Sequence, residues 1–374
     1  MDANASPSAV APTETGRSGV RIPPPRLLAC WDDLMTVGKL HLFVLMLGVI
    51  MIVSSFTFSR NVLEKTPSDL GVSIELFNYT IKESILLENR NNRTVNETVY
   101  IAIPQNSTYQ SSYMISFIPA PIMIRDNNNN TIAYLSFSME PKERKWINST
   151  FRVVVKSYKI NFNYNIAKWP SLDISEKYTG KTLYWDTYNS TLIEFLRSIV
   201  GNDDNPVSIS QKIAEKLASM IDYIPLPVRL GSDRSLVYEG GRIVLKGDCS
   251  EVADVYITLA RIAGIPARMV FGFLLENMSR TVYWLNENEI KGNLTEETLS
   301  RWGGHAWSQV YLRPWGWVDV ELLEGFKPKL GDYSWRHIVY GTESTKFGGS
   351  ELDVLPLLSF SDVLYVRFEF IGAG

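Results

Sequence analysis

Cys249 is the residue whose type and position most directly suggest covalent chemistry. It follows Gly247 and Asp248 at the start of a predicted helix that ends at Gly264, with Pro266 beyond. Unpaired N–H groups and the dipole at a helix N-terminus stabilise negative charge, which lowers the pKa of a thiol and favours the nucleophilic thiolate. The alternative is a buried structural cysteine, which is the usual fate of a single cysteine.

A thiolate nucleophile needs an imidazole partner, and His305 begins a predicted strand at 305–312. Because side chains alternate along a strand, His305, Trp307 and Gln309 are expected on one face. A lone histidine is also common as a structural residue. His305 is, however, one of only two histidines that follow the apolar segment at residues 40–58.

Two acids on the next predicted strand, 317–322, compete to orient that imidazole, as a third group should. If the two strands form a hairpin around residues 313–316, His305 lies opposite residue 323. Glu321 is then two residues out of register, about 7 Å away and within reach of a long side chain. Asp319 is four residues out of register, about 13 Å away. We therefore favour Glu321 as the orienting acid, with Asp319 as the alternative.

The elements expected around these residues indicate an α+β fold. The spacing of apolar residues predicts a helix at 208–221, with Ser208 as its N-cap, and a second helix at 249–263. Glu251 and Asp254 occupy the first turn of the second helix. Strands are expected at 268–275 and over the two segments already described, and a helix followed by antiparallel strands is an α+β layout.

Residues 59–165 differ, because they read as short strand-like runs separated by polar turns. This pattern predicts an all-β, immunoglobulin-like sandwich domain. The stretch contains no histidine or cysteine, so we interpret it as a spacer or recognition module. A further strand at 363–370 is expected to join the sheet of either outer domain, and the pattern leaves open which one.

Residues 40–58 form a run of 19 without Asp, Glu, Lys or Arg, and about 20 apolar residues span the hydrocarbon of a bilayer. We predict a single transmembrane helix. A buried soluble helix is one alternative, and a cleaved signal peptide is another, although 39 residues precede the run. Residues 1–39 are expected to be a flexible cytoplasmic tail, because basic residues are commoner before the run (Arg17, Arg21, Arg26, Lys39) than directly after it (Arg60, Lys65).

The glycosylation acceptor pattern Asn-x-Ser/Thr supports this orientation. It occurs nine times, always after the apolar run and never before it. Each match alone is weak, but the one-sided set favours a cell-membrane protein whose C-terminal domains lie outside and carry glycans. The candidate positions are Asn78, Asn92, Asn96, Asn106, Asn129, Asn148, Asn189, Asn277 and Asn293.

Composition limits the other function classes. The 374-residue chain has a formal net charge of −3 and no basic run, so it offers no electrostatic case for nucleic-acid binding. Two cysteines and three histidines are few for a zinc site, and we expect no metal or cofactor. Cys30 and Cys249 fall on opposite sides of the predicted membrane helix, so a disulfide within one chain is not expected.

Separate motifs resemble the transglutaminase-like superfamily. Gly247-Asp248-Cys249 and the run ARIAGIPAR at 260–268 are similar to its GxC and R-x-x-GIPAR motifs, and GHAW at 304–307 with GWVDVE at 316–321 is similar to its HAW and GW-V-x-V-D motifs. The resemblance covers residues 180–330 approximately. It implies a papain-like core, which we assign to 166–374, with Cys249 as nucleophile, His305 as base and Glu321 at the acid position.

The departures from the family pattern concern the surroundings of this triad. Glu321 stands where Asp is commoner, Leu322-Leu323 replace the usual Pro-Thr, and Gln309 stands where the family often has Glu. The upstream strands resemble the β-domain that precedes this core in archaeal, membrane-anchored relatives.

The resemblance implies a cysteine-dependent acyl-transfer enzyme that acts on peptide or carboxamide bonds of a protein or peptide substrate at the cell surface. We expect hydrolysis, as in a protease or amidase, rather than amine cross-linking, because hydrolases are common among microbial members. The alternative is a catalytically silent envelope protein with a binding or structural role. Trp302, Trp307 and Trp315 are expected either to wall the cleft or to lie in the core.

Overall fold

The computed structural model describes residues 68–226, 228–343, 345–347 and 350–373. Residues from Lys65 to Gly374 form one compact unit. Among the described residues, no helix is both long and apolar enough to cross a membrane. The predicted cytoplasmic tail, 1–39, and the predicted transmembrane helix, 40–58, lie outside the described residues and stay predictions.

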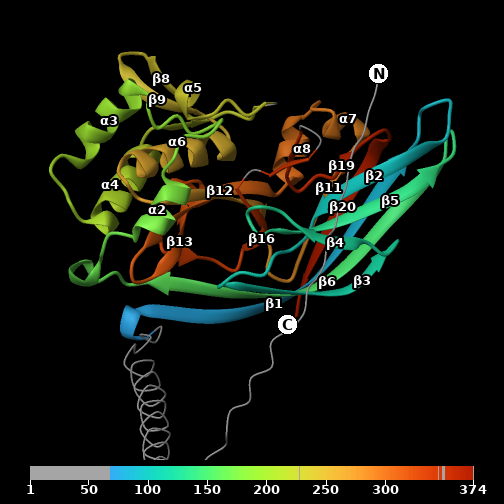
Figure 1. Ribbon diagram of the computed structural model, residues 1–374, viewed down its shortest axis with the longest axis horizontal. Coiled ribbons are helices and arrows are strands. Elements are labelled where there is room, and N and C mark those ends of the chain that lie inside the picture. The colour runs from blue at the N-terminus through green and yellow to red at the C-terminus, as the bar shows by residue number, and fades with distance from the viewer. Residues whose placement is uncertain (1–67, 227, 344, 348–349, 374) are drawn as a thin grey trace, which may run out of the picture. The chain divides into compact units, whose positions relative to one another are not determined.

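Two antiparallel sheets contain most of the upstream strands (Figure 1). The first has the order β11-β20-β1-β6-β15, with β3 also paired to β6, and the second has the order β19-β2-β5-β4. Alternate residues such as Tyr79, Ile81 and Val153 are fully buried, as expected for strands that pack one face on a core. The bounds are β1 Val72–Glu88, β2 Val95–Ala102, β3 Gln110–Ile118, β4 Ile122–Arg125, β5 Thr131–Met139, β6 Arg144–Ile160, β11 Arg280–Asn286, β15 Asp332–Tyr333, β19 Leu357–Leu358 and β20 Asp362–Gly372.

A third antiparallel sheet, with the order β14-β13-β12-β10-β16, positions the residues singled out by the sequence. Helix α6 packs against β12 and β10, and α3 and α4 pack against α6 on the side away from the two upstream sheets (Figure 1). The strand bounds are β10 Ala267–Leu274, β12 Gly304–Leu312, β13 Gly316–Glu321, β14 Lys329–Leu330 and β16 His337–Thr342.

A small sheet, β7-β9-β8, leads directly into α6. The remaining bounds are α2 Leu172–Tyr178, α3 Ser190–Val200, α4 Pro206–Ala218, α5 Ser232–Ser235, α6 Cys249–Ile262, α7 Glu287–Ile290, α8 Glu296–Arg301, β7 Ile221–Tyr223, β8 Leu236–Glu239, β9 Arg242–Gly247, β17 Thr345–Phe347 and β18 Ser350–Leu352. The fold is therefore mixed α and β, and mostly β.

Helix α4 starts and ends earlier than the predicted helix at 208–221. The side chain of Asn205, not that of Ser208, caps it, accepting the N–H groups of Val207 and Ser208 at 3.0 and 3.2 Å. Pro206 at the first helical position strengthens this start. The helix ends at Ala218, and Ile221 pairs with Leu245 in the small sheet instead.

The predicted boundary at residue 165 does not separate two sheets. Strand β20, which contains the predicted strand at 363–370, lies between β1 from the upstream part and β11 from the downstream part. Both parts of the chain therefore contribute strands to this sheet. Buried Glu83 on β1 accepts hydrogen bonds from Ser149 at 2.5 Å and from Tyr340 on β16 at 2.6 Å. Sequence patterns predict which residues are extended but not how strands that are distant in the chain pair, so the shared sheet could not be foreseen.

The upstream strands also support β16. The side chain of Gln110 donates to the Val339 carbonyl at 2.9 Å and accepts the Val339 N–H at 2.8 Å. Asn130 bonds Thr342 in the same two-way manner, at 2.9 Å in each direction. These side-chain amides occupy the edge of β16 that has no strand partner. The upstream part is thus bonded directly to the core sheet. The sequence had indicated a separate spacer or recognition module.

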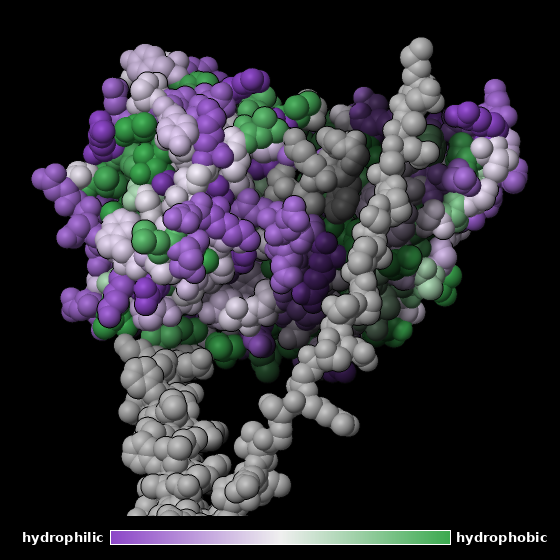
Figure 2. Space-filling model, viewed as in Figure 1, coloured by the Kyte–Doolittle hydropathy of each residue, from purple (hydrophilic) through white to green (hydrophobic). Residues whose placement is uncertain are grey.

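The surface carries the candidate glycosylation sites. On the face shown in Figure 2, polar residues cover much of the area and apolar residues are interspersed. Seven of the nine acceptor asparagines are exposed, and the other two, Asn78 and Asn189, are partly exposed. Each is therefore accessible to a glycan, and glycosylation stays a prediction.

Candidate active site

Cys249 is the first residue of α6, where the sequence predicted it. The Asp248 side chain accepts the Ser250 N–H at 2.9 Å, and the Glu251 side chain accepts the Asp248 N–H at 3.1 Å, which forms a capping box. Gly264, with φ at 84°, follows the helix end. Cys249 is a partly buried residue, and the N–H groups of this first turn lack intrahelical acceptors, so the position suits negative charge.

His305 on β12 and Glu321 on β13 lie in direct contact. The two strands pair from Ser308 opposite Val320 onward, which confirms the predicted hairpin register. The Glu321 Oε2 atom lies 2.7 Å from His305 Nε2. An ionised carboxylate can only accept, so Nε2 carries the proton, and Nδ1 is left for the hydrogen bond between His305 and Cys249.

Asp319 shares the face of β13 with Glu321 but has other partners. Its Oδ1 atom accepts the indole N–H of Trp307 at 2.7 Å and the amide of Gln309 at 2.9 Å, and its Oδ2 atom accepts the Tyr158 hydroxyl at 2.7 Å. The structure therefore brings Glu321, and not the alternative acid, to the imidazole.

A second imidazole, which sequence reasoning did not assign, also contacts Glu321. Buried His337 on β16 has its Nε2 atom 3.2 Å from Glu321 Oε2, and its Nδ1 atom lies 3.1 Å from the Ser334 hydroxyl. Because the carboxylate accepts, Nε2 of His337 donates, and the hydroxyl donates to Nδ1. The only available signal in the sequence was that His337 is the second of the two histidines beyond the apolar run.

Within the described residues, His305, Glu321 and His337 are also the one group of three potential metal ligands, with ligand atoms within 4.8 Å of one another. The expectation of no metal rested on the small number of cysteines and histidines, a count that does not reveal their convergence. Both imidazoles already donate to the same carboxylate oxygen. Hydrogen bonds thus satisfy all three groups, and a metal ion would have to displace both protons.

Burial and charge oppose one another in the pair of His305 and Glu321. Burial alone would lower the pKa of His305, but the charge of Glu321 and hydrogen bonds with Cys249 and Glu321 raise that pKa from 6.5 to about 10. Burial likewise disfavours ionisation of Glu321, yet the imidazolium charge and hydrogen bonds from His305 and His337 hold its pKa well below the usual range. The arrangement therefore favours an imidazolium–carboxylate pair next to the thiol.

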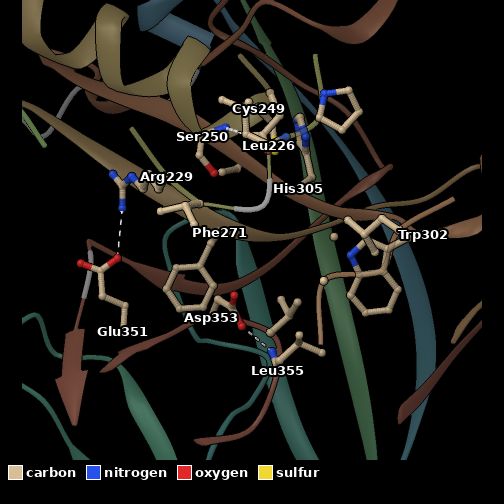
Figure 3. Close-up of a pocket in the computed structure, with 18 of the residues that line it drawn as sticks. Leu226, Arg229, Cys249, Ser250, Phe271, Trp302, His305, Glu351, Asp353 and Leu355 are labelled. Atoms are coloured by element: carbon tan, nitrogen blue, oxygen red, sulfur yellow. Dashed lines mark hydrogen bonds and ion pairs between the residues drawn. The ribbon is translucent and has the colours of Figure 1, made fainter. Parts of the chain in front are cut away.

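A cavity of about 480 Å³ lies beside Cys249 and His305. Figure 3 shows Arg229 and Glu351 toward one end of it and Trp302 toward the other. Trp302 lines this cavity, which is one of the two positions expected for the tryptophans. Trp307 and Trp315 are instead buried and do not line it. Such a volume accommodates a side chain and the adjacent peptide group of a substrate.

Arg229, which the sequence did not single out, holds the segment after β7 against α6. Its guanidinium bonds both carboxylate oxygens of buried Asp254 on α6, at 2.8 and 2.5 Å. Trp185 also donates to Asp254, at 2.7 Å, and another nitrogen of Arg229 lies 3.5 Å from Glu351. A bidentate Arg–carboxylate pair is geometrically strict, so it fixes one rim of the cavity relative to the helix of Cys249.

Part of the chain matches one family model. Residues 193–322 match the family model described as the Transglutaminase-like superfamily. An uncharacterized protein from Haemophilus influenzae is 28% identical over 166 residues, which are 43% of this chain and 43% of that protein. The chain thus spans less than half the length of that relative.

Solved structures are similar at lower identity. A candidate cysteine protease from Cytophaga hutchinsonii has a TM-score of 0.50 and 13% identity, covering 80% of this chain and 99% of that one. The periplasmic domain of TgpA from Pseudomonas aeruginosa, bound to ethylmercury, has a TM-score of 0.31 and 14% identity, covering 68% of this chain and 93% of that one. Of these two, the first supports a shared fold.

Proposed function

We propose that this chain, which matches the transglutaminase-like superfamily model over residues 193–322, is a cysteine-dependent acyl-transfer enzyme acting on peptide or carboxamide bonds. The observation that carries this proposal is that Cys249 and His305 line one cavity, and that the imidazole of His305 contacts Cys249 on one side and buried Glu321 on the other. A nucleophile, a base and an orienting acid in hydrogen-bonded sequence are the groups that such chemistry requires.

In the proposed mechanism, the Cys249 thiolate attacks the carbonyl carbon and forms a C–S bond. Negative charge then develops on the carbonyl oxygen, near the N–H groups at the start of α6. His305 gives its proton to the departing amine as the C–N bond breaks, and Glu321 holds the ring in the required tautomer. The thioester that remains is cleaved by a nucleophile that returns its proton to His305.

We propose water as the usual second nucleophile, which makes the enzyme a protease or amidase and not a cross-linking enzyme. The position of the partly buried residue Cys249 on a cavity supports this choice, because the cavity gives water a route to an acyl group attached there. An amine acceptor would be favoured by a site that excludes water.

We also propose that the enzyme is anchored by residues 40–58 and acts outside the membrane on protein or peptide substrates, as in the archaeal type that its sequence resembles. The apolar run and the nine acceptor sites beyond it support this location. The glycans would then occupy exposed asparagines on both the sandwich and the core.

The test is the pH dependence of Cys249 alkylation by iodoacetamide in the full-length protein, purified in detergent. A Cys30→Ser background leaves Cys249 as the only thiol. Rapid alkylation that persists well below pH 8 in this background, and slows at least tenfold in His305→Ala, is the expected result. An ordinary thiol profile that the second substitution leaves unchanged would exclude an activated Cys–His pair and with it the proposed chemistry.

A further inference from the structure

One wall of the cavity is built by a chain segment that leaves the core sheet and returns to it. After β10 the chain crosses to the sheet that contains β1 and β6, where β11 pairs with β20, and it then forms α7 and α8 before re-entering the core sheet at β12. The segment 275–303 therefore ends two residues before His305. It is tied to the upstream part by Arg90, which bonds both carboxylate oxygens of Glu287 at 2.5 and 2.6 Å.

The side chains that this segment contributes to the cavity are mainly apolar. Leu285 is buried, Ile290 is partly buried, and Leu294 and Leu299 remain 40% and 37% exposed. Large aliphatic side chains that stay this exposed at a cavity wall lose contact with water when an apolar group binds there. Elsewhere the same cavity is lined by Leu352, Val354, Leu355 and Phe271, together with the acids Glu343, Glu351 and Asp353.

The charged groups within this wall are already paired with one another. Glu289 accepts hydrogen bonds from Thr298 at 2.7 Å and from the Asn286 N–H at 2.9 Å, and it forms an ion pair with Arg301. Glu289 also has its pKa held below the usual range because these bonds outweigh its burial. The charges of Glu289 and Arg301 are thus paired with each other and are not left for a polar or ionic substrate group.

We propose that the 275–303 wall is a subsite for a bulky apolar side chain of the acyl donor, so that the enzyme prefers peptide or amide substrates with a large aliphatic or aromatic residue next to the reacting bond. This inference rests on the proposed function, because it assigns part of the same cavity to the substrate of Cys249. The position of the wall supports it, since the wall and the Cys–His pair line one continuous cavity.

The experiment compares chloromethyl ketones of N-acetyl-phenylalanine, N-acetyl-glycine and N-acetyl-aspartate as labels of Cys249. The full-length Cys30→Ser protein in detergent is used, and the second-order rate of labelling is measured by mass spectrometry. Because burial of a phenylalanine side chain is worth roughly tenfold or more in rate, the phenylalanine probe should label at least ten times faster than the glycine probe. The aspartate probe should be the slowest.

Variants of the wall test the location of the preference. Leu294→Asp and Leu299→Asp should reduce the phenylalanine-to-glycine rate ratio toward one. Leu172→Asp, an equivalent change at a leucine that is 81% exposed outside the cavity, should leave the ratio at its wild-type value. A ratio that all three variants leave unchanged would place the preference elsewhere and overturn the proposal.

The outcome also separates this inference from the proposed function. Fast labelling by iodoacetamide with no difference among the three probes would overturn the apolar subsite and leave the activated Cys–His pair intact. Slow labelling by iodoacetamide would overturn the proposed chemistry instead. In that case the subsite is tested by binding and not by labelling. NMR measures the affinity of Cys249→Ala for N-acetyl-phenylalaninamide and for N-acetyl-glycinamide, and equal affinity for the two amides would overturn the subsite as well.

Discussion

Glu321 and Asp319 stand two residues apart on one face of β13, and both are almost completely buried. Their partners are of different kinds. Glu321 accepts hydrogen bonds from two imidazoles, those of His305 and His337. Asp319 accepts only from a phenol, an indole and a carboxamide, and the phenol belongs to Tyr158 of the upstream strand β6.

This difference between the hydrogen-bond donors indicates which of the two buried acids can take part in catalysis. None of the three donors to Asp319 becomes a cation near neutral pH, so that centre can hold strands together but cannot exchange a proton with a nucleophile. An imidazole can carry a positive charge at neutral pH, and the Glu321 carboxylate stabilises that charge. We therefore assign Asp319 to stability and Glu321 to catalysis, and the predictions below test that assignment.

The largest expected effect is on the activity of Glu321→Gln. The glutamine oxygen can still accept the His305 proton, but a neutral amide does not stabilise the imidazolium. We expect kcat/KM to fall by about 10³- to 10⁴-fold, measured with a quenched fluorescent peptide library. The circular dichroism spectrum should match that of the wild type, and a loss of less than tenfold would contradict the role assigned to Glu321.

Asp319→Asn should show the reverse pattern. The substitution replaces one carboxylate oxygen by an NH₂ group, which donates hydrogen bonds and cannot accept them. At least one of the buried N–H or O–H donors around Asp319 is then left without an acceptor. We expect the free energy of unfolding in urea to fall by about 2 kcal/mol. Activity per folded molecule should stay within about threefold of the wild type, and a thousandfold loss with unchanged stability would exchange the roles of the two acids.

His337→Phe should have a smaller effect on the same reaction, because His337 acts through Glu321 and does not contact Cys249 in the described structure. Loss of one hydrogen bond to a charged group is worth about 1.4 kcal/mol, or tenfold in kcat, with KM unchanged. His337→Gln, which keeps an N–H donor, should restore part of the rate. If His337 instead served as a metal ligand, the purified wild-type protein would contain stoichiometric metal that His337→Phe lacks.

Much of this comparison could be predicted from the sequence, because it depends on local order. The motifs place Cys249 at a helix start, and the short hairpin between β12 and β13 fixes the register that brings Glu321 to His305. Side-chain alternation then places Trp307 and Gln309 on the face of Asp319.

The rest depends on contacts between segments that are distant in the chain. Tyr158 and Asp319 are 161 residues apart, and Gln110 and Val339 are 229 apart. No periodicity within either segment specifies the other, so neither the contact of β6 with Asp319 nor that of Gln110 on β3 with β16 was predictable. For the same reason the sequence indicated a boundary at residue 165 where the structure has a shared sheet.

The smallest expected effect is a shift of the basic limb of the pH–rate profile. In the wild type the raised pKa of His305, about 10, keeps the imidazolium through neutral pH. Its contribution to stability is fully present below the unfolded pKa near 6.5 and is lost as the pH rises through about 10. Removal of the negative charge in Glu321→Gln lowers the folded pKa of His305, which must give a proton to the departing amine, so the basic limb of kcat/KM for peptide hydrolysis should move to lower pH by roughly one unit or more. Asp319→Asn, whose side chain does not touch the ring, should leave that limb in place. An equal shift in both variants would mean that His305 responds to the total charge of β13 and not to its hydrogen-bonded partner.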